Sequence, residues 1–255
     1  MIGSVQKTLK ILNTISEGKN RPVSLSYIST ETGINKSTCS HIISTLVAEG
    51  FVKKISHTKG YVLGPATYCL SRYGKYENEF ASICHPLLRW LNKKTGYSVI
   101  LAVVEGSQKY TIDYIDTEKM LPESSGIMPD DMYRTATGRI ILANMDKSDI
   151  KKIFEKTGIP PEEHWDEVTS FETLEAKLSE LDKNGVVQTY CVRDDGKILL
   201  GYASAVFRYT KCVGAIGVAV LCTREEYEQF EEKEKLIKHN IIKARTEIGR
   251  RLKYS

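Results

Sequence analysis

The chain has 255 residues, of which 41% are hydrophobic and 27% are charged. That length is enough for two modest domains, each with its own core. The longest uncharged apolar stretch, 213–222, has about ten residues, whereas a membrane-spanning helix needs roughly 20. Residues 1–7 lack the apolar centre of a secretory signal. We therefore expect two domains, no membrane association and a cytoplasmic location.

The cysteines do not show the short C-x-x-C spacings that zinc and redox sites favour. There are six of them, Cys39, Cys69, Cys84, Cys191, Cys212 and Cys222. Reduced and mostly buried thiols are the expected state. The sequence accordingly predicts no metal site and no cofactor.

The positive charge is concentrated at the N-terminal end of the chain. Residues 1–75 contain ten lysines or arginines and three glutamates, which is a net charge of +7. The remaining residues contain 26 basic and 29 acidic side chains, which is a net charge of −3. This division is typical of a phosphate-binding module attached to a domain that does not bind nucleic acid.

A helix-turn-helix is predicted within the first 50 residues. Apolar side chains recur at helical spacing over residues 5–15, and Ser24 is placed to cap a short second helix. Gly33 can adopt the left-handed conformation of a sharp turn, and Asn35 is placed to cap a third helix that runs to about residue 49. Helix, tight glycine turn and helix is the arrangement of this DNA-binding motif.

The third helix has two faces of different character. Its inward stripe follows the spacing i, i+3, i+4 and i+7 and consists of Cys39, Ile42, Ile43 and Leu46. The opposite face carries small hydroxyl groups and one imidazole, which allow a helix to approach base edges and phosphates closely. Two short strands, 51–56 and 61–63, follow it and predict a β-hairpin with a basic tip, which would form a wing.

Each of these features alone is ordinary, because three helices can simply pack, exposed lysines are usually solvated and a histidine is more often structural. Their order within about 65 residues favours DNA binding. We expect the phosphate contacts to come from Lys36, Lys53, Lys54 and Lys59. The candidates for contacts with base edges are Ser37, Thr38, Ser40, His41 and Thr45.

The remainder of the chain is predicted to be an α+β domain with a mainly antiparallel sheet. The expected organisation is a DNA-binding domain over residues 1–64, a linker helix over 65–76 and a larger domain over 77–255. Predicted strands cover 98–104, 109–115, 186–190, 198–207 and 211–222. Thr223 and Glu226 form a capping box that we expect to begin a long terminal helix, which would cover its own sheet.

The chain resembles the IclR family of bacterial regulators over nearly its whole length. The segments that carry the resemblance are Val5–Leu12, Asn35–Leu46, Pro86–Leu91 with Thr95-Gly96, and Thr135–Arg139 with Leu142-Ala143. The resemblance implies a GAF-like effector-binding domain and a homodimer or homotetramer that binds palindromic operator DNA. It also implies control of transcription, as repressor or activator, by a small metabolite that is often an organic or aromatic acid.

The resemblance also places candidate effector-binding residues in the larger domain. These are Thr135, Ala136, Gly138, Arg139, Cys191, Asp194, Gly201, Gly217 and Ala219. Backbone amides at the start of a helix near Thr135 would attract an anionic group of the effector. Ordinary helix capping at Thr135 and a surface salt bridge for Arg139 are the alternatives. Glycine and alanine at 201, 217 and 219 predict a roomy pocket of low polarity.

The competing hypothesis is an enzyme or sensor domain with an accessory nucleic-acid-binding module. A pocket that binds a small molecule can also catalyse a reaction. No Ser-His-Asp or Cys-His set is recognisable by spacing, and no glycine-rich phosphate loop occurs in the sequence. We therefore predict no catalytic residues and a DNA-binding transcriptional regulator.

Overall fold

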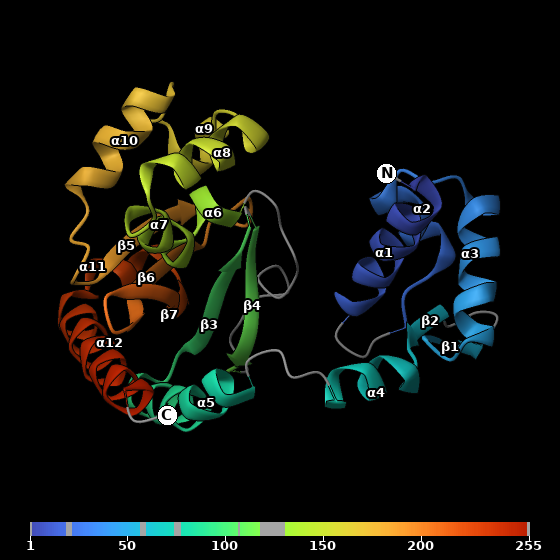
Figure 1. Ribbon diagram of the computed structural model, residues 1–255, viewed down its shortest axis with the longest axis horizontal. Helices are drawn as coiled ribbons and strands as arrows, with labels where there is room; N and C mark the ends of the chain where they lie inside the picture. The colour runs from blue at the N-terminus through green and yellow to red at the C-terminus, as the bar shows by residue number, and fades with distance from the viewer. Residues whose placement is uncertain are drawn as a thin grey trace. The chain divides into compact units, whose positions relative to one another are not determined.

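A computed structural model describes residues 2–18, 22–56, 60–73, 78–106, 108–117 and 131–253 (Figure 1). The chain divides into two compact units, the first reaching from the N-terminus to Asn78 and the second beginning at Glu79. Each unit has hydrophobic core residues of its own. The expected domain boundary at residue 76 falls outside the described residues.

The first unit is a helix-turn-helix followed by a hairpin. Its elements are α1 (Gly3–Ser16), α2 (Leu25–Thr32), α3 (Lys36–Ala48), β1 (Val52–Ser56) and β2 (Gly60–Leu63). Side chains from all three helices, including Ile11, Ile28 and Ile43, form the core. Helix α4 (Pro65–Tyr73) follows where a linker helix over 65–76 is predicted, and residues 74–76 are not among those described.

The predicted caps of the second and third helices are confirmed. Ser24 Oγ accepts a hydrogen bond from the Tyr27 amide at 3.2 Å, and Asn35 Oδ1 accepts one from the Thr38 amide at 2.8 Å. Between the two helices, Gly33 has a φ of 68°, in the left-handed region. These caps satisfy amides that have no acceptor within their own helices. The start of each helix is therefore determined by side chains next to it in the sequence.

The second unit is built on a five-stranded sheet in the order β4-β3-β7-β6-β5, with every neighbouring pair antiparallel. The strands are β3 (Ser98–Glu105), β4 (Gln108–Ile115), β5 (Val187–Val192), β6 (Ile198–Arg208) and β7 (Lys211–Cys222). The helices are α5 (Asn78–Thr95), α6 (Asp131–Arg134), α7 (Ala136–Ala143), α8 (Lys147–Thr157), α9 (Glu162–Trp165), α10 (Phe171–Glu180), α11 (Arg224–Glu228) and α12 (Glu231–Leu252). The α+β prediction with a mainly antiparallel sheet is confirmed.

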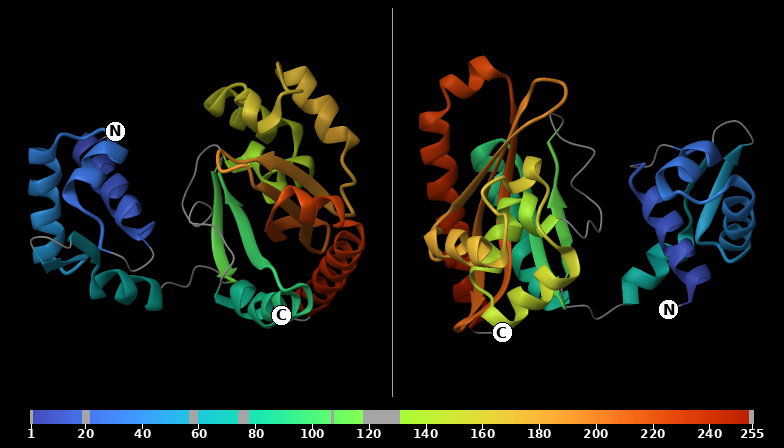
Figure 2. Two further views of the ribbon diagram at one scale, coloured as in Figure 1. Left: turned by 180° about the vertical axis from the view of Figure 1, so that it is seen from behind. Right: turned by 90° about the horizontal axis from the view of Figure 1, so that it is seen from above.

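Helices cover both faces of this sheet (Figure 2). On one face, α5 and α12 pack against alternate strand residues such as Leu101 and Tyr202. On the other face, α7 packs against small residues such as Ala203 and Ala215, beneath α8, α9 and α10. Strand side chains alternate between the two faces, so each strand contributes to both cores.

The terminal helix covers its own sheet as expected, because Ile237, Ile241 and Ile248 are buried in the same core as β6 and β7. Its predicted start was wrong. The capping box of Thr223 and Glu226 is present, but it begins the short helix α11, and α12 begins at Glu231. A capping box determines where a helix begins and places no limit on how soon that helix ends.

Candidate DNA-binding surface and effector site

Helix α3 presents the predicted polar face to solvent. Lys36, Ser37, His41 and Thr45 are exposed, and Thr38 and Ser40 are half-buried. On the opposite face Cys39, Ile43 and Leu46 are buried, and Ile42 is half-buried. Ser44 and Thr45 hydroxyls donate to carbonyls one turn earlier in the helix. The structure therefore brings the candidate base-contacting residues of α3 together on one side.

A hydroxyl and thiol network that sequence reasoning missed fixes the turn before α3. Ser29 Oγ donates to the Ile34 carbonyl at 2.7 Å, and Cys39 Sγ donates to the same carbonyl at 3.5 Å. Thr32 Oγ1 donates to the Ile28 carbonyl at 2.6 Å and accepts from the Ile34 amide at 3.3 Å. These bonds tie α2 to α3, so they determine the angle at which α3 leaves the turn.

The predicted wing is the antiparallel pair β1–β2, with Lys53 opposite Val62 and Lys54 opposite Tyr61. Lys53 and Lys54 are both exposed, and neighbouring strand residues point to opposite faces. Lys54 Nζ lies 6.0 Å from the centre of the Tyr61 ring. The two lysines therefore extend from opposite faces of the hairpin. Lys59, the third predicted contact of the wing, lies outside the described residues.

In the second unit, the predicted residues at the start of α7 lie directly on the sheet. Thr135 Oγ1 accepts a hydrogen bond from the Gly138 amide at 3.1 Å, so the ordinary cap is present. Ala136 and Gly138 are buried, and α7 packs against β5, β6 and β7. Cys191, Gly201, Gly217 and Ala219 share the sheet face that α7 covers, with Gly201 paired to Ala219 across β6 and β7.

The two glycines do not widen a pocket, contrary to the expectation from sequence. A Cβ atom at Gly201 would lie 2.5 Å from Thr189 Oγ1 and 3.4 Å from Ala136 Cβ. A Cβ atom at Gly217 would lie 2.7 Å from Thr137 Cγ2. The space beside both glycines is thus filled by α7 and β5. The absence of side chains allows the first turn of α7 to approach the strands closely.

Arg139 and Asp194 are not brought to this face. The Arg139 guanidinium donates to the carbonyls of Tyr133 and His164 at 2.7 and 2.6 Å, and it lies 4.0 Å from the centre of the Trp165 ring. Burial lowers the pKa of Arg139 to about 10. Asp194 is exposed in the turn between β5 and β6. Arg139 therefore connects α9 to α7. These contacts account for an arginine at this position without a ligand.

Lys109 is a charged residue at this site that sequence reasoning missed. It is 3% exposed, and its Nζ donates to Thr135 Oγ1 at 2.9 Å and to Thr137 Oγ1 at 3.2 Å. The alternation of side chains along β4 indicates part of this placement. Tyr110 and Ile112 pack into the core on one face of the sheet, so Lys109 lies on the other face. That Lys109 reaches α7 depends on a contact across 26 residues, which no local pattern reveals.

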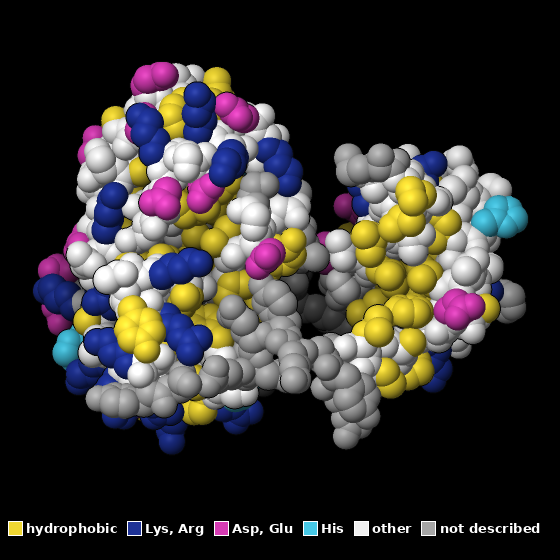
Figure 3. All heavy atoms as spheres, in the orientation of Figure 1, with side chains coloured by type: hydrophobic (Ala, Val, Ile, Leu, Met, Phe, Trp, Pro, Cys, Tyr) yellow, Lys and Arg dark blue, Asp and Glu magenta, His cyan; other side chains and the backbone are white. Residues whose placement is uncertain are grey.

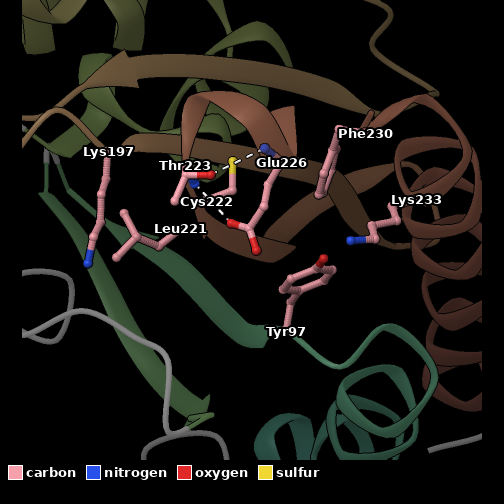
Figure 4. Close-up of a pocket in the computed structure, with 8 residues that line it drawn as sticks. All are labelled: Tyr97, Lys197, Leu221, Cys222, Thr223, Glu226, Phe230 and Lys233. Atoms are coloured by element: carbon pink, nitrogen blue, oxygen red, sulfur yellow. Dashed lines mark hydrogen bonds between the residues drawn. The ribbon is translucent and has the colours of Figure 1, made fainter. Parts of the chain in front are cut away.

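A separate cavity of about 420 Å³ lies where β7 ends and α11 begins (Figure 4). Its lining residues are Tyr97, Lys197, Leu221, Cys222, Thr223, Glu226, Phe230 and Lys233. Lys197 and Lys233 stand at opposite sides of it in Figure 4. The predicted effector-binding residues do not line this cavity.

The side chains nearest to a Cys-His-Asp arrangement do not form a nucleophilic site. His85 Nδ1 lies 2.8 Å from Asp113 Oδ2, and His85 Nε2 accepts from Arg89 at 3.1 Å, so both ring nitrogens are engaged. The neighbouring Cys84 is buried, and desolvation raises the pKa of its thiol to about 12. A thiol of such a pKa stays protonated near neutral pH and is a weak nucleophile.

In the part of the chain that the structure describes, groups of three or more His, Cys, Asp or Glu side chains arranged to hold a metal ion do not occur. Within the same residues, every helix is too short or too polar to cross a membrane.

Two family models match the sequence. The model described as the IclR helix-turn-helix domain matches residues 4–56, and the one described as the bacterial transcriptional regulator IclR C-terminal domain matches residues 77–250. Together they cover more than half of the chain.

Curated relatives include transcriptional regulators of several bacteria. The transcriptional repressor IclR of Escherichia coli is 24% identical over 163 residues, which are 62% of this chain and 58% of that protein. The regulator KdgR of the same species is 23% identical over 234 residues, which are 91% of this chain and 87% of that protein. The regulator TtgV of Pseudomonas putida is 32% identical over 124 residues, which are 48% of this chain and 46% of that protein.

Solved structures share the fold of this chain. An IclR transcriptional regulator from Alicyclobacillus acidocaldarius has a TM-score of 0.67 at 21% identity, with 98% of this chain and 100% of that chain covered. An IclR homolog from Microbacterium hydrocarbonoxydans, complexed with 4-hydroxybenzoate, has a TM-score of 0.65 at 14% identity, with 96% and 98% covered. This chain therefore belongs to the IclR family of transcriptional regulators, with an IclR helix-turn-helix domain followed by an IclR C-terminal domain.

Proposed function

We propose that this protein controls transcription by binding operator DNA through α3 and the β1–β2 wing, under control of a small organic or aromatic acid. The observation that carries the proposal is the exposed face of α3, where small hydroxyls, His41 and Lys36 stand opposite a buried apolar stripe. Lys36, Lys53, Lys54 and Lys59 are assigned to phosphates. Ser37, Thr38, Ser40, His41 and Thr45 are assigned to base edges.

The effector is assigned to the sheet face beside the first turn of α7. Thr135, Ala136, Gly138, Cys191, Gly201, Gly217 and Ala219 remain the proposed surroundings of the effector. The half-buried Ile100, Thr111 and Tyr114 continue this face on β3 and β4. The bound 4-hydroxybenzoate of the Microbacterium homolog supports an aromatic acid as the first compound to test.

A homodimer or homotetramer is proposed as the DNA-binding form. Ile2, directly before helix α1, and Val5 and Leu9 within it are 71%, 51% and 54% exposed and share one side of the helix. Figure 3 shows hydrophobic side chains gathered on the first unit over α1 and α4, where Leu70 is 65% exposed. Contiguous exposed apolar surface of this kind marks interaction sites. Sedimentation analysis of the wild type and Leu9→Glu tests this proposal, with a smaller species expected for the variant.

Residues 1–64 would bind DNA, 65–76 would link, and 77–255 would bind the effector and contribute to the oligomer together with the apolar surface of the first unit. The protein would act in the cytoplasm without catalysis and without a cofactor. The engaged nitrogens of His85 and the raised pKa of Cys84 support the absence of catalysis at that cluster.

The deciding experiment measures binding of the full chain to DNA from upstream of its own gene over a series of salt concentrations. It is repeated with benzoate, 4-hydroxybenzoate and short-chain organic acids. We expect specific, salt-sensitive binding whose affinity one acid changes by about 5- to 150-fold, the usual range of allosteric coupling. Specific binding that no acid alters would reject the effector class. Absence of DNA binding would reject the regulator itself.

A further inference from the structure

The cavity of about 420 Å³ beside α11 lies at one end of the sheet (Figure 4). Tyr97 directly precedes β3, Lys197 directly precedes β6, and Cys222 is the last residue of β7. Antiparallel pairing brings these strand ends together, because Ile198 at the start of β6 pairs with Cys222 and the start of β3 pairs with the end of β7. Sites for small molecules usually have volumes of about 300–1,000 Å³, so this cavity is large enough for one.

This cavity is separate from the proposed effector site. The buried residues of its wall, Cys222 and Phe230, belong to the core that α5 and α12 form with one face of the sheet, and Tyr97 packs against that core. The first turn of α7 packs against the opposite face. A molecule in this cavity would therefore leave the surroundings of α7 free.

The cavity has an apolar wall with a positive charge beside it. The rings of Tyr97 and Phe230 have centres 6.0 Å apart and planes inclined by 52°. The half-buried Leu221 adds an aliphatic surface. Lys233 Nζ lies 5.9 Å from the centre of the Phe230 ring, near the outer limit of a cation–π contact at about 6 Å. A small molecule can therefore place its apolar part on the rings and a negative group next to Lys233.

Lys233 and Glu226 bring opposite charges to the cavity without pairing with each other. The carboxylates around Lys233 at the start of α12 are paired with Lys235 or Lys238 at 2.6–2.9 Å. Among the residues that the structure describes, Lys233 has no carboxylate partner. A cation and an anion that face one cavity without touching can each bind a group of opposite charge on a ligand.

The charged and polar groups of the cavity converge. In Figure 4 the Lys233 ammonium and the Tyr97 hydroxyl point toward each other, and the Glu226 carboxylate faces the same space. One oxygen of Glu226 accepts from the Thr223 amide at 2.9 Å, so the capping box holds this carboxylate in place. The Tyr97 hydroxyl has no hydrogen-bond partner in the described part of the chain. Burial raises the pKa of Cys222, Glu226 raises it further and Lys233 opposes the rise, so both charges act at one place.

We infer that this cavity is a second ligand site and that it takes a free α-amino acid. The carboxylate of the amino acid binds Lys233 and the Tyr97 hydroxyl, and its ammonium group binds the second oxygen of Glu226. Its side chain lies against the aromatic wall. A simple anion would meet the negative charge of Glu226 and a simple cation would meet Lys233, whereas a zwitterion is attracted by both.

The test measures binding of L-leucine, L-phenylalanine and L-glutamate to the full chain by calorimetry. Glutamate is included because Lys197, on the opposite side of the cavity, suits an acidic side chain. Low salt is used, since Lys233 and Glu226 are exposed and salt screens exposed charges. Each amino acid is compared with its α-carboxamide, which lacks the negative charge. We expect at least one amino acid to bind tenfold or more tightly than its amide, about the effect of one charge-assisted hydrogen bond.

Three variants separate the cavity from other places on the surface. Lys233→Met should lower the affinity for that amino acid about tenfold and abolish the preference over the amide. Glu226→Gln keeps an oxygen for the Thr223 amide, removes the charge and should lower the affinity by a similar factor. Lys235→Met is the matched control, because Lys235 is an exposed lysine of the same helix that does not line the cavity; its affinity should equal that of the wild type. Circular dichroism checks that each variant is folded.

Four results would overturn the inference. The first is that none of the three amino acids binds, and the second is that amide and acid bind equally well. The third is an unchanged affinity in folded Lys233→Met, or an equal loss in Lys235→Met, which would place the amino acid elsewhere. The fourth is a loss in Lys233→Met without one in Glu226→Gln, which would mean that the cavity binds simple anions.

Discussion

The two candidate sites of this protein are built in different ways. The candidate DNA-binding surface consists of exposed and half-buried side chains on one helix and one hairpin, within residues 36–63. The candidate effector site combines β4, α7 and strands β5 to β7, whose residues are separated by up to about 110 positions and are mostly buried. A substitution on the first surface should change binding and leave folding intact, whereas a substitution in the second should affect both.

The largest effect is expected at Gly217. A Cβ atom there would lie 2.7 Å from Thr137 Cγ2, so Gly217→Ala should lower the free energy of unfolding of the second unit by about 1–3 kcal/mol through overpacking. Chemical denaturation of the full chain measures this change. Adding Thr137→Ser removes the Cγ2 methyl group and should restore most of the stability. If the double variant is no more stable than Gly217→Ala, the close approach of α7 is not the cause.

A smaller loss of stability is expected at the cap of α3. Asn35→Ala removes the acceptor of the 2.8 Å bond from the Thr38 amide and should destabilise the first unit by about 1 kcal/mol. Asn35→Asp keeps an acceptor oxygen and serves as the matched control. Denaturation curves of both variants test the prediction, which fails if alanine and aspartate at this position give the same stability.

Lys36→Ala should alter DNA binding without altering stability. Loss of one phosphate contact lowers the slope of log affinity against log salt concentration by about one. Lys152→Ala is the control, because it removes the same charge from an exposed side chain of the second unit. An equal slope for the wild type and Lys36→Ala would show that the N-terminus of α3 does not face the phosphate backbone.

The smallest effect concerns Glu247 at the end of α12. Hydrogen bonds from Arg250 and Arg251 lower the pKa of Glu247 to about 2 from an ordinary value of 4.5. A lowered carboxyl pKa contributes stability above pH 4.5, and that contribution disappears as the pH falls toward 2. NMR titration should give a midpoint near 2, which rises when both arginines are replaced by alanine. Because these side chains are exposed, high salt should weaken the effect.

The sequence by itself determined the helix-turn-helix, the caps at Ser24 and Asn35, the inward stripe of α3 and the strands of the antiparallel sheet. These features depend on residues that are close in sequence, where periodicity, capping and turn chemistry act directly. Only the tertiary structure decided that α7 fills the space beside Gly201 and Gly217, that Arg139 binds the carbonyls of Tyr133 and His164, and that Lys109 reaches Thr135. Most of those contacts join segments that are distant in the sequence, and they depend on how side chains pack between strands and helices.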